Sequence, residues 1–139
     1  MELFVNIRQL GSKKQPAPVP FHIEGSPKTA SELVEAAVRV CVSEYNERVR
    51  RGEINDAPLS RMQIKDMADA GRIAFGINYG GKEQDSGEAV KNALLAYRDG
   101  LFRMFIGDAE PASPDAEISL SDGDVLTFVR LVMLTGRMW

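Results

Sequence analysis

The sequence predicts a single α+β domain, and three features carry this prediction. Apolar and polar residues alternate near the start of the chain, a long stretch with helical periodicity follows, and the chain ends in an apolar run rich in β-branched residues. The chain has 139 residues, of which 44% are hydrophobic and 27% are charged, as in a soluble globular domain with a hydrophobic core. We therefore expect a sheet packed against at least one helix.

Composition excludes several classes of function. Seventeen Lys and Arg against twenty Asp and Glu give a net charge of -3, which supplies no basic field for a nucleic acid. One Cys and one His exclude an intramolecular disulfide and a zinc site built from several Cys and His ligands. We expect no metal and no cofactor.

The chain also lacks the features of a secreted or membrane-spanning protein. Residues 1–8 alternate and include an early acid, unlike a secretory signal, which starts basic and continues as an apolar run. The longest apolar stretch lies near the C-terminus and is interrupted by Thr127, Arg130 and Thr135. We expect a cytoplasmic protein that does not bind membranes.

The first elements form a predicted hairpin followed by a helix. Residues 2–10 alternate as in a half-buried strand, and a linker rich in Pro and charge at 11–20 leads to a second strand at 21–24. Thr29 and Glu32 have the spacing of a capping box. The helix then extends from 31 to about 51, and its apolar positions are Leu33, Val34, Ala37, Val38, Cys41, Val42 and Tyr45.

The middle of the chain is harder to interpret. A turn at 52–58 precedes a short helix that carries Ser60, Met62, Ile64 and Met67 and ends at Gly71. Residues 72–79 fit either a strand or an irregular arm, whereas 86–97 have helical spacing. We expect the first of these helices to be short and the second to stop at Asp99-Gly100.

The C-terminal part predicts two strands. Residues 101–106 form the first, and a loop that contains Pro follows it. Residues 121–124 have turn chemistry, and the β-branched run at 125–134 has the composition of a buried, central strand.

Two of these segments carry a resemblance to a known superfamily. Leu101-Phe102-Arg103-Met104-Phe105-Ile106-Gly107 looks like the ubiquitin-type strand that closes in an apolar run and Gly. Leu120-Ser121-Asp122-Gly123-Asp124-Val125-Leu126-Thr127-Phe128 looks like the acidic turn and terminal strand of small sulfur carriers. With the order of elements, the chain resembles the ubiquitin-like β-grasp superfamily.

The resemblance implies an architecture for the whole chain. Residues 1–139 would form one β-grasp domain, with a mixed sheet packed on one long helix. Its core would comprise residues 1–51 and 101–136. A helical insertion at about 52–100 would lie between the long helix and the later strands, and this insertion has no counterpart in the minimal fold.

The last strand offers a predicted interaction surface. Its alternate residues form two sets, and both sets are largely apolar. Either the insertion folds back over the second set, which we favour, or that set is a patch that binds a partner or a second copy. The sheet face is the usual recognition surface of ubiquitin-like proteins. The predicted function is therefore a non-catalytic protein-interaction module, with partner-binding residues Leu126, Phe128, Arg130, Val132 and Leu134.

An alternative function follows from the C-terminus. Ubiquitin-like modifiers and sulfur carriers end in Gly-Gly, whereas this chain ends Gly136-Arg137-Met138-Trp139. Removal of the last three residues would expose Gly136 as a processing or conjugation site. The partners would then be a protease and an activating enzyme.

Other chemical motifs are incomplete. The segment 76–82 matches the first seven positions of a phosphate-binding loop, but Glu83 stands where that motif needs Ser or Thr. His22 has no nucleophile near it in sequence, and Cys41 lies on the apolar face of the long helix. The acids at 108–110 and 122–124 fit turn positions. We predict no catalytic residue.

Overall fold

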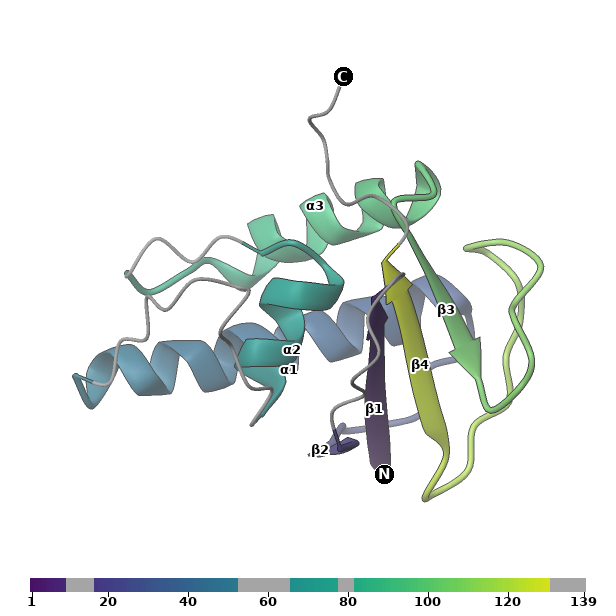
Figure 1. Ribbon diagram of the computed structural model, residues 1–139, viewed down its shortest axis with the longest axis horizontal. Coiled ribbons are helices and arrows are strands. Elements are labelled where there is room, and N and C mark those ends of the chain that lie inside the picture. Colours follow the sequence, from purple (N-terminus) through teal and green to yellow (C-terminus); the bar gives the residue numbers. More distant parts are fainter. Residues whose placement is uncertain (10–16, 53–65, 78–81, 131–139) are drawn as a thin grey trace.

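The structure, a computed structural model, describes residues 1–9, 17–52, 66–77 and 82–130 (Figure 1). These residues form an α+β fold with a long helix α1 and two further helices between β2 and β3. The elements are β1 (Glu2–Gln9), β2 (Val19–His22), α1 (Ala30–Arg50), α2 (Met67–Ala74), α3 (Ser86–Arg98), β3 (Phe102–Ile106) and β4 (Val125–Arg130). No helix among them is long and apolar enough to cross a membrane.

The described strands form one mixed sheet of order β2-β1-β4-β3. β1 pairs antiparallel with β2 and parallel with β4, and β4 pairs antiparallel with β3. The last strand is therefore central, as its composition predicts. A parallel pairing of β1 with β4, in a sheet packed against helices, is consistent with a β-grasp-like fold.

The inner face of this sheet packs against the helices. It presents Leu3, Val5 and Ile7 from β1, and the register places Leu126 and Phe128 beside the last two. These side chains join the buried face of α1 in one hydrophobic core. Figure 1 shows α1 passing behind the strands, so the opposite, outer face of the sheet is turned toward the viewer.

An aromatic cluster connects the insertion to the inner face. The ring of Phe75, just after α2, meets Phe128 and Phe102 edge to face, with centroids 4.9 Å and 5.1 Å apart. Tyr97 from α3 stacks on Phe102 at 5.3 Å. Such pairs add a preferred geometry to the burial of large apolar rings. The insertion therefore packs on the same side of the sheet as α1.

This arrangement corrects two predicted site residues. Leu126 and Phe128 were expected on a surface, but both are fully buried in the core. The helical insertion does cover the set that contains Phe128, yet α1 covers it as well, and the other set faces outward.

One of the two hydrogen bonds of the predicted capping box is present at the start of α1. Thr29 caps the helix, and its hydroxyl accepts the Glu32 N–H at 3.2 Å. The Glu32 carboxylate accepts the N–H of Lys28 at 3.0 Å, one residue before the cap. Backbone carbonyls of Ala116 and Pro114 accept the N–H groups of Ala30 and Ser31. The segment between β3 and β4 therefore completes the cap.

β2 begins two residues earlier than predicted, within the expected linker. Val19 and Phe21 point inward and are buried, while Pro20 is exposed. β2 lies at the edge of the sheet, where a residue without a backbone N–H disturbs no ladder. Pro20 is thus compatible with a strand, although composition alone assigns this segment to a linker.

The predictions around Gly71 are wrong. Gly71 lies inside α2 rather than at a helix end, and residues 72–74 are helical rather than a strand or an arm. Asp66 caps the start of α2 by accepting the Asp69 N–H at 3.1 Å. After the end of α2, the backbone turns at Gly76, which has a φ of 69°. Residues 53–65, which include most of the predicted short helix, lie outside the described residues.

Burial at neighbouring positions of β4 predicts very different effects on stability. Phe128→Ala removes a ring from the core and should lower the free energy of unfolding by about 3–5 kcal/mol. Val129→Ala, on the outer face, should lower it by at most about 1 kcal/mol. Urea-induced unfolding of both variants measures the difference. Equal losses would contradict the assignment of faces.

Candidate functional site

The outer face of the sheet is a surface on which side chains of several strands converge. It carries Phe4, Asn6 and Arg8 from β1, Val125, Thr127 and Val129 from β4, and Arg103 and Phe105 from β3. None of these side chains is buried, and Phe4 is 37% exposed. We call this set the outer face.

The strand register orders the outer face into three rows. Phe4 lies beside Val125 in the first row, and Asn6, Thr127 and Phe105 form the second. The third row is Arg8, Val129 and Arg103. Neighbouring strands lie about 4.8 Å apart, so side chains of one row contact each other. The result is an apolar first row, a middle row in which Phe105 lies beside the polar Thr127 and Asn6, and arginines in the third row.

The two arginines differ in their surroundings. The Arg103 guanidinium carbon lies 5.5 Å from the centroid of the Phe105 ring, and its Nε donates to Glu110 Oε2 at 2.8 Å. Hydrogen bonding to Arg103 lowers the pKa of Glu110. Arg8 is exposed, and no hydrogen bond or ion pair engages it within the described part of the chain.

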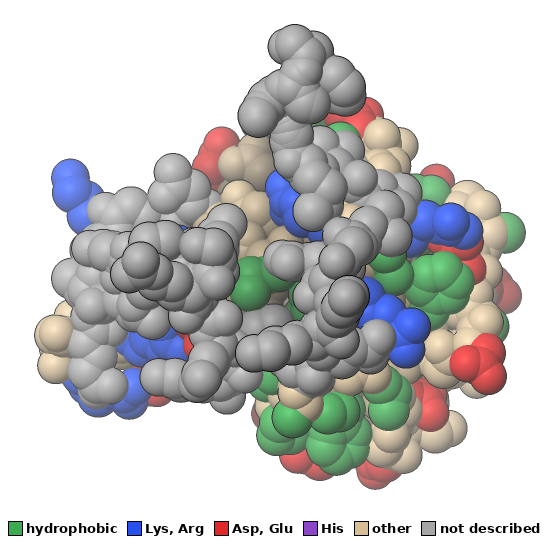
Figure 2. Space-filling view, viewed as in Figure 1, with side chains coloured by type: hydrophobic (Ala, Val, Ile, Leu, Met, Phe, Trp, Pro, Cys, Tyr) green, Lys and Arg blue, Asp and Glu red, His purple; other side chains and the backbone are tan. Residues whose placement is uncertain are grey.

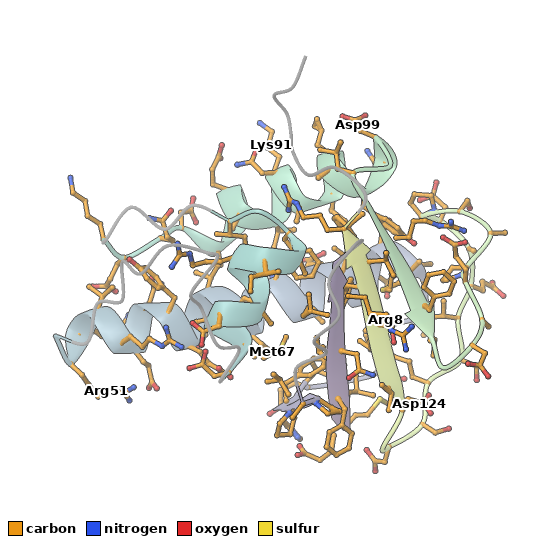
Figure 3. The ribbon with its side chains drawn as sticks, viewed as in Figure 1. Arg8, Arg51, Met67, Lys91, Asp99 and Asp124 are labelled. Carbon is orange, nitrogen blue, oxygen red and sulfur yellow. The ribbon has the colours of Figure 1, made fainter. Side chains whose placement is uncertain are left out.

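Acidic residues gather at the opposite end of the same face. Glu2 lies at the start of β1, and its N–H donates to Asp122 Oδ1 at 2.9 Å. Asp124, just before β4, accepts the N–H of Phe4 on its carbonyl at 3.0 Å. Figure 2 shows acidic side chains along the lower and right-hand edges of this view, and Figure 3 labels Arg8 and Asp124.

The remaining predicted partner-binding residues lie elsewhere. Arg130 is half-buried, and its Nη1 donates to the carbonyls of Ile73 and Ala74 at 3.3 and 3.4 Å. A cation at these carbonyls compensates the C-terminal end of α2, and burial lowers the arginine pKa. Arg130 therefore fastens the insertion to β4. Val132, Leu134 and Gly136 lie outside the described residues.

A second polar group joins α1 to α2. Arg48 donates from Nη1 to Asp69 Oδ1 at 3.1 Å and from Nε to Asp66 Oδ2 at 3.2 Å. Glu44 Oε1 accepts the N–H of Met67 at 2.9 Å, in the first turn of α2. Burial lowers the pKa of Arg48, but the hydrogen bonds to Asp66 and Asp69 outweigh it and raise the pKa. The arginine is thus held as a cation between the helices.

The other residues weighed in the sequence have structural surroundings. Burial raises the pKa of the Cys41 thiol well above its usual range, which keeps the thiol protonated. His22 is exposed, with Nδ1 2.5 Å from Glu2 Oε2. Glu83 pairs with Arg50 at 2.8 Å, while residues 78–81 of the loop-like motif lie outside the described residues. Among the described residues, no group of three His, Cys, Asp or Glu side chains could hold a metal ion.

The sequence contained a signal for the outer face that the prediction did not use. Phe4 stands between Glu2 and Asn6 on the polar side of the first strand. A large aromatic residue in the polar set of a half-buried strand marks a surface that is not simply solvated.

Comparisons with protein families, with curated proteins and with solved structures found no match for this chain.

The contact between Gly76 and Arg130 predicts an unequal cost of two glycine substitutions. Both Gly76 and Gly25 have positive φ, so Ala costs about 1–2 kcal/mol at either position. A Cβ at Gly76 would also lie 2.9 Å from Arg130 Nη1, whereas one at Gly25 meets nothing within 4 Å. Gly76→Ala should lose about 1 kcal/mol more stability than Gly25→Ala, because the guanidinium of Arg130 must leave its carbonyl acceptors. In an Arg130→Ala background this excess should vanish; its persistence in urea unfolding would contradict the contact.

Glu44 predicts a pH dependence of stability. Burial raises its pKa, and Asp66 adds to this effect, while the Met67 N–H and Arg48 oppose it. The folded state thus binds the proton of the Glu44 carboxyl more tightly than the unfolded state does. The stability that this protonated carboxyl contributes is therefore lost as pH rises above about 4. Relative to the native chain, Glu44→Gln should therefore gain stability with rising pH. Its amide oxygen still accepts the Met67 N–H.

The measurement is chemical denaturation of the native chain and of Glu44→Gln from acidic to neutral pH. Glu47→Gln, at an exposed position of the same helix, is the matched control and should show a smaller change. A stability difference between Glu44→Gln and the native chain that is constant across this range would be inconsistent with a carboxyl of raised pKa.

Proposed function

We propose that this chain is a non-catalytic protein-interaction module that binds its partner through the outer face of the sheet. The observation that carries the proposal is a group of apolar side chains on that face that are not buried, namely Phe4, Val125 and Phe105, which lie around Thr127. The helices α1, α2 and α3 pack on the other side. The outer face is therefore not used by the core of the fold.

The chemistry of the outer face favours a protein as partner. Aromatic and arginine side chains are enriched in protein interfaces, and a polar rim around an apolar centre is their common arrangement. Phe4 and Phe105 supply the aromatic surface, and Arg8 and Arg103 border it at one end. The resemblance to the ubiquitin-like β-grasp superfamily supports the same proposal, since proteins of that kind are recognised through the sheet.

The proposed surface differs from the one expected from sequence. It keeps the last strand as the recognition element but uses Val125, Thr127 and Val129 in place of Leu126 and Phe128. Aromatic and β-branched side chains that are not buried lie in adjacent strands here, and a partner could contact them without any rearrangement of the core.

Site-specific photo-cross-linking in the cells that make the protein tests this function. Phe4 is replaced by p-benzoylphenylalanine, which keeps an aromatic ring on the outer face. Leu95, 52% exposed on α3, receives the same replacement as the matched control. We expect a protein adduct of defined mass from position 4 that position 95 does not give, and Val129→Asp should abolish it.

Two results would count against the function. One is the absence of an adduct at position 4 after irradiation, and the other is the same adduct at positions 4 and 95. Either outcome would show that the outer face is not a specific recognition surface. Circular dichroism of each variant checks that the fold is retained.

A further inference from the structure

We propose that residues 131–139, which follow β4 and lie outside the described residues, pack against an exposed apolar ridge at the C-terminal end of α3. The ridge consists of Leu95 on α3 and Leu101 just before β3. Three observations support the proposal: the geometry at the end of α3, the register of β3 with β4, and the composition of the segment 131–139. The proposal is independent of the partner surface, because the ridge and the outer face have no side chain in common.

The end of α3 brings two large leucines together. The N–H of Gly100, which has a φ of 75°, donates to the Tyr97 carbonyl at 3.1 Å. The N–H of Leu101 donates to the Ala96 carbonyl at 3.0 Å. These two bonds define a Schellman motif, in which the residue after the glycine commonly contacts an apolar side chain in the last turns of the helix. Leu101 and Leu95 occupy these two positions.

Both leucines are exposed in the described part of the chain. Leu95 is 52% exposed and Leu101 is 36% exposed, and Phe4 is the third large hydrophobic residue in this class. Lys91 and Arg98 are exposed and share the face of Leu95, because residues three and four apart are neighbours on a helix (Figure 3). An apolar ridge of this kind, bordered by charged side chains, is a surface on which another segment can pack.

The strand register brings the chain to this ridge. β3 and β4 are antiparallel, and Phe102 pairs with Arg130. Leu101 precedes Phe102 in the chain, and Leu131 follows Arg130. The chain therefore leaves β4 at the level of Leu101. Figure 1 shows the tip of β4 close to the place where the end of α3 leads into β3.

The composition of the segment suits an apolar contact. Residues 131–139 have the sequence LVMLTGRMW, in which all but Thr135, Gly136 and Arg137 are apolar. An extended chain of this length spans up to about 30 Å. Leu95 lies within about 10 Å of the end of α3, since a helix rises 1.5 Å per residue, so the segment is long enough to cover the ridge.

The charges predict what kind of contact this is. The segment contains no acidic side chain that would pair with Lys91 or Arg98. Burial of apolar surface therefore supplies the attraction, and the ring of Trp139 can add a cation–π contact with one of these two cations. We expect the contact to persist at high salt, because it depends little on exposed ion pairs.

This packing bears on the alternative function considered from the sequence. A protease cleaves most readily where the chain is accessible and not held by other contacts. A segment that is packed on α3 withholds the bond between Gly136 and Arg137 from a protease. The proposal thus favours a non-covalent module over a carrier that is matured at Gly136.

The fluorescence of Trp139 tests the proposal, because this residue is the only tryptophan of the chain. In the native chain we expect emission at a shorter wavelength, and weaker quenching by acrylamide, than in the urea-unfolded chain. Leu95→Asp should lower the ratio of packed to free segment by about tenfold or more, since it removes a leucine from the contact. Its emission and quenching should move toward those of the unfolded chain. Phe4→Asp is the matched control and should change neither.

Three results would overturn the proposal. The first is a native chain whose tryptophan is quenched as strongly as that of the unfolded chain, a readout that needs no variant. The second is a change with Phe4→Asp and none with Leu95→Asp, which would place the segment on the outer face. The third is emission that depends on protein concentration, which would mean that a second copy supplies the segment. Circular dichroism checks that both variants retain the fold.

These results are distinguishable from a failure of the proposed function. Cross-linking from position 4 reports on the outer face, whereas the tryptophan reports on the ridge. Either proposal therefore stands or fails without the other. Emission of the native chain that is the same at low and high salt would support an apolar contact, and a shift toward the emission of the unfolded chain at high salt would contradict it.

Discussion

The parallel pairing of β1 with β4 is the constraint on which the rest of the structure depends. It joins strands that lie more than a hundred residues apart in the chain, with Phe4 beside Val125 and Ile7 beside Phe128. Because side chains alternate along both strands, this register decides at once which residues enter the core and which form the outer face. A shift of one residue in β4 would exchange Phe128 with Val129 and expose the aromatic cluster.

That register also decides where the insertion can pack. Phe75 contacts Phe128 and Phe102 on the inner face, so α2 must lie beside α1 rather than across the sheet. Both ends of this short helix have backbone groups that need hydrogen-bond partners. Arg48 and Glu44 meet its first turn, and Arg130 meets its last carbonyls. Burying these charges is favourable because each is paired or hydrogen-bonded.

Sequence patterns predicted where the elements lie in the chain better than which face of the last strand enters the core. The alternation of Leu3, Val5 and Ile7, the cap at Thr29 and the spacing of 86–97 depend on local contacts, and each element lies where these patterns place it. The sides of the last strand do not follow from local contacts, because Leu126 and Val125 are both apolar. Only the register with β1 distinguishes them. The predicted helix end at Gly71 was wrong for a related reason, since a buried glycine inside a helix has the same sequence signal as a glycine at a helix end.

The edges of the sheet explain why association would use a face rather than a strand. At β2, Pro20 lacks the N–H that an added strand would need. At β3, Phe102 and Met104 are buried, and Ile106 exchanges backbone hydrogen bonds with Ala109. Strand addition is thus opposed at Pro20 in β2 and at the Ile106 end of β3. The outer face, with Phe4, Val125 and Phe105 not buried, therefore remains as the surface on which a partner can pack.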